Sequence, residues 1–217
     1  MPRTIAIGDI HGCDIALEAV LHAIKPTPED LIITLGDVVD RGGDTKRTID
    51  LLLELGNQCR YLGILGNHEE MMLKVVVDKQ PPHNWLQHGG VATLDSYGFC
   101  GDLGVIPANH LALLRGFLPY YETESHFFVH ANYEPKKSLD KQSASMLRWR
   151  RLDEHMPAPH ISGKVAVLGH TADHTGEVLS LKHMTCIDTY CHGGQWLTAL
   201  DVATGQLWQA SEAGHLR

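Results

Sequence analysis

The sequence predicts an α/β fold with parallel strands in its first part and antiparallel strands at its end. In the first 77 residues, short apolar and β-branched runs alternate with longer segments whose apolar residues recur at helical spacing. After residue 178, short runs of alternating apolar and polar residues follow closely on one another, as in β-hairpins. A chain of 217 residues, 43% of them hydrophobic, can bury a sizeable core. We therefore expect a single domain over residues 1–217.

The chain opens with a β-α-β unit. Residues 3–7 form a short β-branched strand, and Asp14 can act as the N-cap of an amphipathic helix that ends near Pro26. Residues 31–35 are typical of a strand buried on both faces. Two strands joined through a helix in this way are expected to be parallel, with a right-handed crossover.

The next unit repeats this pattern. Asp44 or Thr45 can start a second amphipathic helix, and Gly56 can stop it. Residues 59–65 then form the third strand, and a helix rich in Met and Val covers about 69–77.

The middle of the chain interrupts the alternation of strands and helices. Residues 78–121 contain several prolines and glycines, which predict short helices and loops forming a cover segment beside the sheet. Its clearest helix covers 107–115. The remaining strands are expected at 127–129, 165–168, 178–181, 185–188, 196–202 and 207–209.

Composition argues against several classes of protein. The 26 Asp and Glu exceed the 18 Lys and Arg, and a net charge of −8 argues against a broad surface for nucleic acid or anionic membranes. The five cysteines are dispersed and form no C-x-x-C pair, which argues against a disulfide framework or a cysteine zinc site. No apolar run is long enough for a signal peptide or a membrane span. We therefore expect a cytoplasmic protein without nucleic-acid or membrane partners.

Side chains capable of binding metal follow five of the expected strands. They are Asp9, His11, Asp37, Asp40, Asn67, His68, His130 and His170. Any one of them alone is as compatible with a structural role. Because strand ends at one edge of a sheet converge, however, the set predicts one shared site.

The chemistry of these side chains suits a pair of metal ions. Oxygen and imidazole ligands together favour Mn²⁺, Fe or Zn²⁺ over Ca²⁺. There are more ligands than one open catalytic ion needs, whereas two ions about 3.5–4 Å apart would use them well. Asp37, directly after a buried strand, is the candidate for a carboxylate that bridges both ions.

Three motifs carry a resemblance to a known family. G-D-x-H-G at 8–12, G-D-x-V-D-R-G at 36–42 and G-N-H-E at 66–69 resemble the phosphoprotein phosphatases, a family of metallophosphoesterases. The compact bacterial and phage serine/threonine protein phosphatases are the most similar type. The resemblance continues through His130, His170 and the segment 187–189. It implies the calcineurin-like α/β/β/α sandwich, in which two mixed β-sheets are flanked by helices.

The resemblance also implies roles for the site residues. One metal ion would be held by Asp9, His11 and Asp37, and the other by Asp37, Asn67, His130 and His170. A hydroxide bridging the two ions, with Mn²⁺ the expected metal, would attack phosphorus in line.

The general acid and the phosphate ligands follow from the same resemblance. His68 would protonate the leaving oxygen, oriented by Asp40. Arg41 and Arg150 would bind the phosphoryl oxygens. Arg150 follows from its spacing after Leu147, and the neighbouring Arg148 and Arg151 remain alternatives.

Two departures from the family pattern lie near the expected site. Asn132 stands where the family usually has glycine after His130-Ala131. Tyr190, Cys191 and His192 follow Asp188-Thr189, where glycine is usual. Tyr190 and His192 would then either shape substrate choice or simply pack at the rim.

Three functions remain open on these residues. Asp40 and Glu69 favour a serine/threonine protein phosphatase, or one of dual specificity that also accepts tyrosine. The alternative is a bis(5'-nucleosyl)-tetraphosphatase, which hydrolyses dinucleoside polyphosphates. A non-catalytic metal-binding module would be indicated by loss of a ligand, of His68 or of both arginines, and all of these are present.

Overall fold

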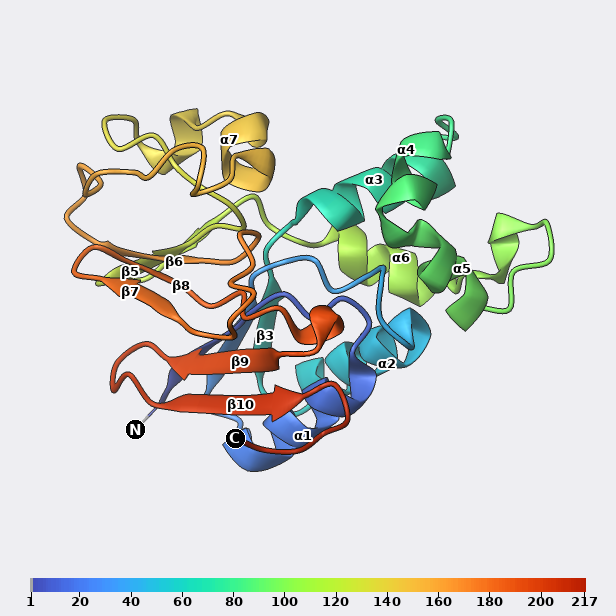
Figure 1. Ribbon diagram of the computed structural model, residues 1–217, viewed down its shortest axis with the longest axis horizontal. Helices are drawn as coiled ribbons and strands as arrows, with labels where there is room; N and C mark the ends of the chain where they lie inside the picture. The colour runs from blue at the N-terminus through green and yellow to red at the C-terminus, as the bar shows by residue number, and fades with distance from the viewer. Residues whose placement is uncertain (1) are drawn as a thin grey trace.

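Two five-stranded sheets pack face to face and are flanked by helices (Figure 1). The computed structural model describes residues 2–217. Side chains from both sheets fill the space between them: Ala6, Ile33, Leu35, Ile64, Phe128, Val167, Ile187 and Leu200. The predicted α/β/β/α sandwich of two mixed sheets is confirmed.

The first sheet has the strand order β10-β9-β1-β2-β3. Its strands are β1 (Thr4–Ile7), β2 (Leu31–Thr34), β3 (Arg60–Gly63), β9 (Trp196–Asp201) and β10 (Leu207–Ser211). The first three are parallel, with Ile5 opposite Ile32 and Ile32 opposite Tyr61. The other two add an antiparallel hairpin beside β1.

Helix α1 (Asp14–Ile24) and helix α2 (Thr45–Gly56) connect the parallel strands. As predicted, α2 begins after Asp44, whose side chain accepts a hydrogen bond from the Arg47 backbone, and it ends at Gly56. The prediction that Asp14 caps α1 is wrong. Cys13 occupies the cap position without a side-chain cap, because a tight turn brings the chain into the helix one residue earlier. Asp14 instead lies in the first turn, where a negative charge favours the helix dipole.

The second sheet has the order β4-β5-β6-β8-β7. Its strands are β4 (Tyr121–Glu122), β5 (His126–Phe128), β6 (Val165–Leu168), β7 (Leu179–Leu181) and β8 (Met184–Cys186). The predicted hairpin of β7 and β8 is present, but β8 also pairs in parallel with β6. The two hairpins of the tail therefore belong to different sheets, and β4 is a strand that the sequence pattern did not predict.

The cover segment consists of short helices, as expected, and stands to the right of the sheets in Figure 1. It follows α3 (Asn67–Val76) and contains α4 (His83–Trp85), the π-helical turn η1 (Leu86–Gly90), α5 (Val91–Ser96), the short 3-10 helix η2 (Leu103–Val105) and α6 (Ala108–Arg115). Later in the chain come η3 (Leu139–Lys141), α7 (Ala144–Trp149) and η4 (Cys191–Gly193). Across residues 2–217, every helix is too short or too polar to span a bilayer.

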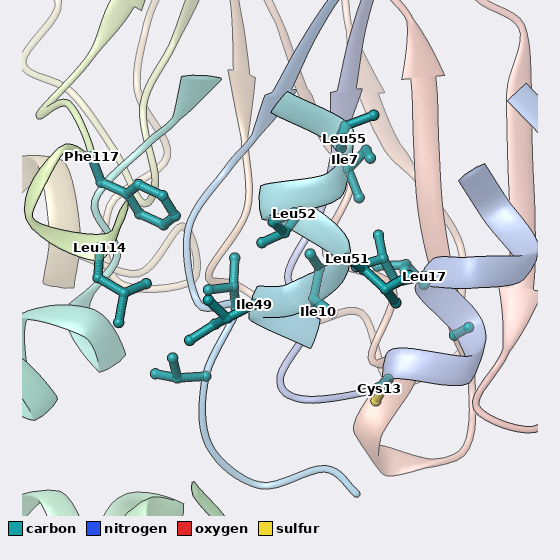
Figure 2. Close-up of a cluster of buried hydrophobic side chains, with 14 of the residues drawn as sticks. Ile7, Ile10, Cys13, Leu17, Ile49, Leu51, Leu52, Leu55, Leu114 and Phe117 are labelled. Carbon is teal, nitrogen blue, oxygen red and sulfur yellow. The ribbon is translucent and has the colours of Figure 1, made fainter. Parts of the chain in front are cut away.

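A large hydrophobic cluster fastens the first sheet to α1, α2 and the cover segment. In Figure 2 this cluster contains side chains from β1 and the turn after it, from both helices, and from the end of the cover segment: Ile7, Ile10, Leu17, Ile49, Leu52, Leu55, Leu114 and Phe117. A fully buried aliphatic side chain contributes roughly 1.5–3 kcal/mol. Ile10 is one of these, and it lies between Asp9 and His11 in the chain. Its burial therefore anchors the turn that carries two of the predicted metal ligands.

Candidate metal centre

The turns after five strands bring the predicted metal-binding side chains to one edge of the sandwich. Asp9 and His11 follow β1, Asp37 follows β2, and the others follow β3, β5 and β6. All of the predicted ligands except the partly exposed His170 are buried. The strand ends therefore converge on one site, as the sequence predicts.

The backbone of these turns is unusually strained. Five site residues other than glycine lie in the left-handed region: His11, Asp37, Asp40, Arg41 and His170, with φ between 46° and 72°. Each such residue costs on the order of 1–3 kcal/mol and persists only where its surroundings enforce it. Strain of this kind collects at functional sites.

Glu69 enforces much of this geometry. Its buried carboxylate accepts hydrogen bonds from the backbone N–H groups of Asp37, Val38 and Val39, at 2.9, 2.7 and 3.3 Å. It also accepts one from Gly66, at 3.0 Å. Burial raises the pKa of Glu69 to about 7, and the charge of Asp37 adds to the effect. In the sequence, Glu69 is part of a motif and an indication of the substrate, with no structural role assigned to it; in the structure it supports the turn that carries Asp37.

Asp37 lies at the centre of the site. Its Oδ2 is 3.7 Å from His11 Nε2, 3.9 Å from His68 Nε2 and 3.4 Å from His130 Nε2. Two groups of closely spaced ligand atoms share it: His11, Asp37 and His68 form one, and Asp37, His130 and His170 the other. Burial alone would raise the pKa of Asp37, but the surrounding imidazoles lower it well below its ordinary value. The carboxylate is therefore ionised, and it is shared by both groups.

Backbone carbonyls set the orientation of three histidines. His11 Nδ1 donates to Val39 O at 3.0 Å, and His130 Nδ1 donates to Leu35 O at 2.8 Å. His170 donates through Nε2 to Trp149 O at 3.1 Å. Such bonds orient each ring and leave the other ring nitrogen as the one that can bind metal, once any proton or hydrogen bond at it is displaced. In His11 and His130 that other nitrogen lies 3.7 and 3.4 Å from Asp37 Oδ2, and in His170 it lies 3.1 Å from His130 Nε2.

The second group fits a metal ion because its donor atoms face one another. Asn67 Oδ1 lies 3.0 Å from both His130 Nε2 and His170 Nδ1, and 3.3 Å from Asp37 Oδ2. The lone pairs of Asn67 Oδ1, His170 Nδ1 and Asp37 Oδ2 repel one another at these distances unless a positive charge lies among them, either a proton on His130 Nε2 or a metal ion. Turning the amide over would let its nitrogen donate to His170 Nδ1 and Asp37 Oδ2 instead. The donor set of nitrogen and oxygen suits Mn²⁺, Fe or Zn²⁺.

Asp9 lies beside the two groups rather than within either. Both of its carboxylate oxygens accept from the His170 backbone N–H at 3.1 Å. Burial raises the pKa of Asp9 well above its ordinary value, and the nearby charge of Asp188 raises it further. A divalent cation would reverse this effect and favour the ionised carboxylate.

Asp188 is a buried acidic residue of the site that the sequence analysis did not assign. Burial raises its pKa to about 6. The signal was present but misplaced, because the predicted strand at 185–188 included this residue. In the structure β8 ends at Cys186, so Asp188 also follows a strand end.

His68 and Asp40 form a buried hydrogen-bonded pair next to the two groups. His68 Nδ1 is 2.7 Å from Asp40 Oδ2, and the His68 ring meets the His11 ring edge-on at 4.7 Å. Burial opposes protonation of His68, but the charges of Asp37 and Asp40 outweigh it and raise the pKa of His68. Asp40 also accepts hydrogen bonds from Trp85 and Thr93 of the cover segment, and neither residue was predicted at the site.

The arginines occupy different places. Arg41 lies in the site, with Nη1 3.0 Å from His11 Nε2. The three later arginines each pair with an acidic side chain: Arg148 with Glu70, Arg150 with Glu154 and Arg151 with Asp153. Arg150 and its partner are about half exposed. The structure thus brings Arg41 among the predicted ligands and leaves Arg150 on the solvent side.

The sequence profile of the calcineurin-like phosphoesterase family matches residues 2–194. The chain belongs to the calcineurin-like phosphoesterases. The resemblance carried by the three motifs is confirmed at this level.

The relatives of this phosphoesterase have two kinds of name. Serine/threonine-protein phosphatase 2 of Salmonella typhimurium is 36% identical over 85 residues, which cover 39% of this chain and 37% of that protein. A symmetrical bis(5'-nucleosyl)-tetraphosphatase of Janthinobacterium is 29% identical over 140 residues, covering 62% of this chain and 45% of that protein. Each match therefore spans less than half of the relative's length.

The fold has a counterpart among solved structures. A protein crystallised as a candidate diadenosine tetraphosphatase superposes with a TM-score of 0.73 at 22% identity, covering 97% of this chain and 95% of that one. At this identity the likeness concerns the fold alone.

The rim of this phosphoesterase's site carries Tyr190 and His192, as the departure from the family pattern suggested. Tyr190 has a left-handed backbone, with φ of 59°, and its ring stacks on His174 at 4.1 Å between centroids. The His192 ring meets the His11 ring at 4.6 Å. Burial lowers the pKa of His192 to about 4, with the charge of Arg41 adding to the effect. His192 is therefore a neutral group at the mouth of the site.

Proposed function

We propose that this chain is a two-metal phosphomonoester hydrolase that dephosphorylates serine and threonine in proteins. One observation carries the proposal: the ionised Asp37 is shared by two groups of metal-binding atoms, and a buried His68–Asp40 pair lies beside them. Two adjoining cation sites next to a positioned proton donor suit the hydrolysis of a phosphate ester.

The metal ligands divide between two positions. Asp9, His11 and Asp37 would hold one ion, and Asp37, Asn67, His130 and His170 the other. Two divalent ions, with Mn²⁺ the first choice, would lower the pKa of a bound water and polarise the phosphoryl group. Around them, the buried turns exclude solvent and fix the ligands before substrate arrives.

The chain's own groups supply the proton and the positive charge. His68 would give the proton at Nε2 to the leaving oxygen, while Asp40 holds Nδ1 and so fixes the ring. Arg41 would bind the phosphoryl oxygens from its place beside His11. Arg150 is the proposed second phosphate ligand, with Arg148 and Arg151 as alternatives. Each of these three arginines forms an ion pair with an acidic side chain in the structure, and the substrate phosphate would have to replace that side chain.

A dinucleoside polyphosphate is the second candidate substrate. It is favoured by the Janthinobacterium relative named as a bis(5'-nucleosyl)-tetraphosphatase, which aligns with more of this chain than the Salmonella phosphatase does. The Asp40 and Glu69 positions favour the protein phosphatase instead. The metal chemistry serves both substrates, so the choice rests on contacts outside the phosphate.

The first experiment tests hydrolysis itself. The metal-stripped protein is assayed on p-nitrophenyl phosphate before and after addition of Mn²⁺. We expect turnover that depends on Mn²⁺ and disappears in Asp37→Asn, while the exposed loop variant Asp102→Asn retains it. Folded protein that stays inactive with Mn²⁺, Fe²⁺ and Zn²⁺ would rule the proposal out.

The second experiment separates the substrates. Values of kcat/KM are compared for phosphoserine and phosphothreonine peptides and for diadenosine tetraphosphate. A higher value on the peptides supports the protein phosphatase, and a higher value on the dinucleotide transfers the assignment to the second candidate.

A further inference from the structure

Two side chains of the cover segment reach the pair formed by His68 and Asp40. Thr93 Oγ1 donates to Asp40 Oδ1 at 2.7 Å, and Trp85 Nε1 donates to the same oxygen at 2.9 Å. Trp85 is 1% exposed, and Thr93 and Asp40 are fully buried. These contacts span 45 and 53 residues of sequence. The cover segment is therefore joined directly to the centre of the site.

The hydrogen bonds divide between the two oxygens of Asp40 in a way that fixes the carboxylate. Oδ1 accepts hydrogen bonds from Thr93 and Trp85. Oδ2 accepts one from His68 at 2.7 Å and a longer one from Trp85 at 3.1 Å. Rotation of the carboxylate would break bonds at both oxygens at once. Because the group is out of contact with water, no solvent could replace them.

The backbone of Asp40 and Arg41 also forms hydrogen bonds to the cover segment. The Asp40 backbone N–H donates back to Thr93 Oγ1 at 3.0 Å, so Thr93 bonds to Asp40 twice. The next residue, Arg41, donates its backbone N–H to Gly89 O at 3.2 Å. Gly90 lies against the Trp85 ring, where an added Cβ would come within 2.6 Å of the indole. The segment from Trp85 to Thr93 is thus fitted to the turn that carries Asp40 and Arg41.

We propose that Trp85 and Thr93 are positioning residues for the general acid, holding the Asp40 carboxylate in the orientation that aims the His68 ring at the leaving group. The inference rests on the proposed function, in which His68 is the general acid. The cover segment then contributes to the chemical step and not only to the walls of the site.

The proton transfer from His68 determines which reaction rates Trp85 and Thr93 should affect. The oxygen of the attacking hydroxide forms a bond to phosphorus as the bond between phosphorus and the leaving oxygen breaks. The electron pair of the broken bond goes to the leaving oxygen, which takes the proton from His68 Nε2. His68 is left neutral, with its Nδ1 proton still bonded to Asp40. A stable leaving anion such as p-nitrophenolate needs this proton less than phenolate or an alkoxide does. Misplacing His68 should therefore slow esters of poor leaving groups selectively.

The test compares p-nitrophenyl phosphate with phenyl phosphate in the Mn²⁺-loaded protein. We expect Trp85→Phe and Thr93→Val each to lower kcat on phenyl phosphate on the order of tenfold, the effect of one hydrogen bond to a charged group. The loss on p-nitrophenyl phosphate should be clearly smaller, and KM should change little. Thr93→Ser, which keeps the hydroxyl, should restore the wild-type ratio of the two rates.

Matched controls remove similar groups elsewhere. Trp208→Phe on β10 and Thr48→Val on α2 alter an indole and a buried hydroxyl outside the site, and should leave the ratio unchanged. A second measurement does not need turnover: in metal-free protein, the NMR signal of the His68 Nδ1 proton should shift in Thr93→Val and not in Thr93→Ser.

The outcomes separate this inference from the function on which it rests. If wild-type protein fails to hydrolyse either ester, the proposed function has failed. If His68→Asn leaves the ratio of the two rates unchanged, the general acid has been assigned wrongly. If His68→Asn changes the ratio but the folded Trp85 and Thr93 variants do not, the positioning role is refuted.

Discussion

Replacing Glu69 by glutamine tests whether one buried carboxylate holds the turn that carries Asp37. Glu69 Oε2 accepts from the backbone N–H of Asp37 and Gly66, and Oε1 accepts from Val38 and Val39. A glutamine side chain keeps one of these oxygens and turns the other into an NH₂ group. Whichever way the amide is placed, two buried backbone donors then face another donor.

The expected cost follows from this count. A buried donor left without an acceptor costs about 1–3 kcal/mol, so two of them predict a loss of about 2–6 kcal/mol in the free energy of unfolding. Alternatively, the turn moves so that these backbone groups find other acceptors, which would displace Asp37 and weaken metal binding. Either result shows that Glu69 supports the turn.

The assay is urea unfolding of the metal-free protein at a pH above 7, where the Glu69 carboxylate is ionised, followed by titration with Mn²⁺. Glu54→Gln is the matched control, because Glu54 pairs with Arg47 on the surface of α2 and its side chain is 57% exposed. That control should change stability by less than about 1 kcal/mol. Wild-type stability together with wild-type Mn²⁺ affinity in Glu69→Gln would refute the reasoning.

Three further predictions concern the metal centre. Asp37→Asn should lower affinity for both ions, because both groups share this carboxylate; calorimetry that finds one full-affinity Mn²⁺ site would contradict the bridging role. His68→Asn should retain both ions and lose about 10²–10⁴-fold in kcat on phenyl phosphate, and an unchanged rate would exclude His68 as the acid. The third concerns pH. Burial by itself lowers the pKa of His130, but the charge of Asp37 raises it to about 10, so at pH 6–8 the metal-free ring holds a proton that Mn²⁺ must displace. The Mn²⁺ Kd should therefore rise about tenfold for each unit that pH is lowered, and a Kd independent of pH would refute this.

Residues that act within one helical turn predicted the ends of α2. Asp44 and Gly56 marked the start and end of α2 because a cap and a stop act within one turn of helix. The strand boundary at 185–188 was less well determined, since apolar alternation does not say where pairing ends. That error of two residues concealed Asp188 inside a strand instead of at its end.

The assignment of strands to sheets depended on the whole chain. Alternation predicted both hairpins of the tail, but the same pattern occurs in β7–β8 of the second sheet and in β9–β10 of the first. Nothing within a hairpin specifies the strand beside which it packs. The choice follows from the hydrophobic layer between the two sheets, which forms only when the chain is complete.

The sequence by itself predicted which side chains gather at the candidate site of this phosphoesterase, because they occur in short motifs directly after strands, and parallel strand ends converge. Only the tertiary structure decided how the site is supported. Glu69 acts on a turn about 30 residues away in sequence, and Trp85 and Thr93 lie 45 and 53 residues from Asp40. Hydrogen bonds over such distances leave no periodic pattern in the sequence. They depend on the packing of the cover segment against the turn after β2, which places the donors where the carboxylate needs them.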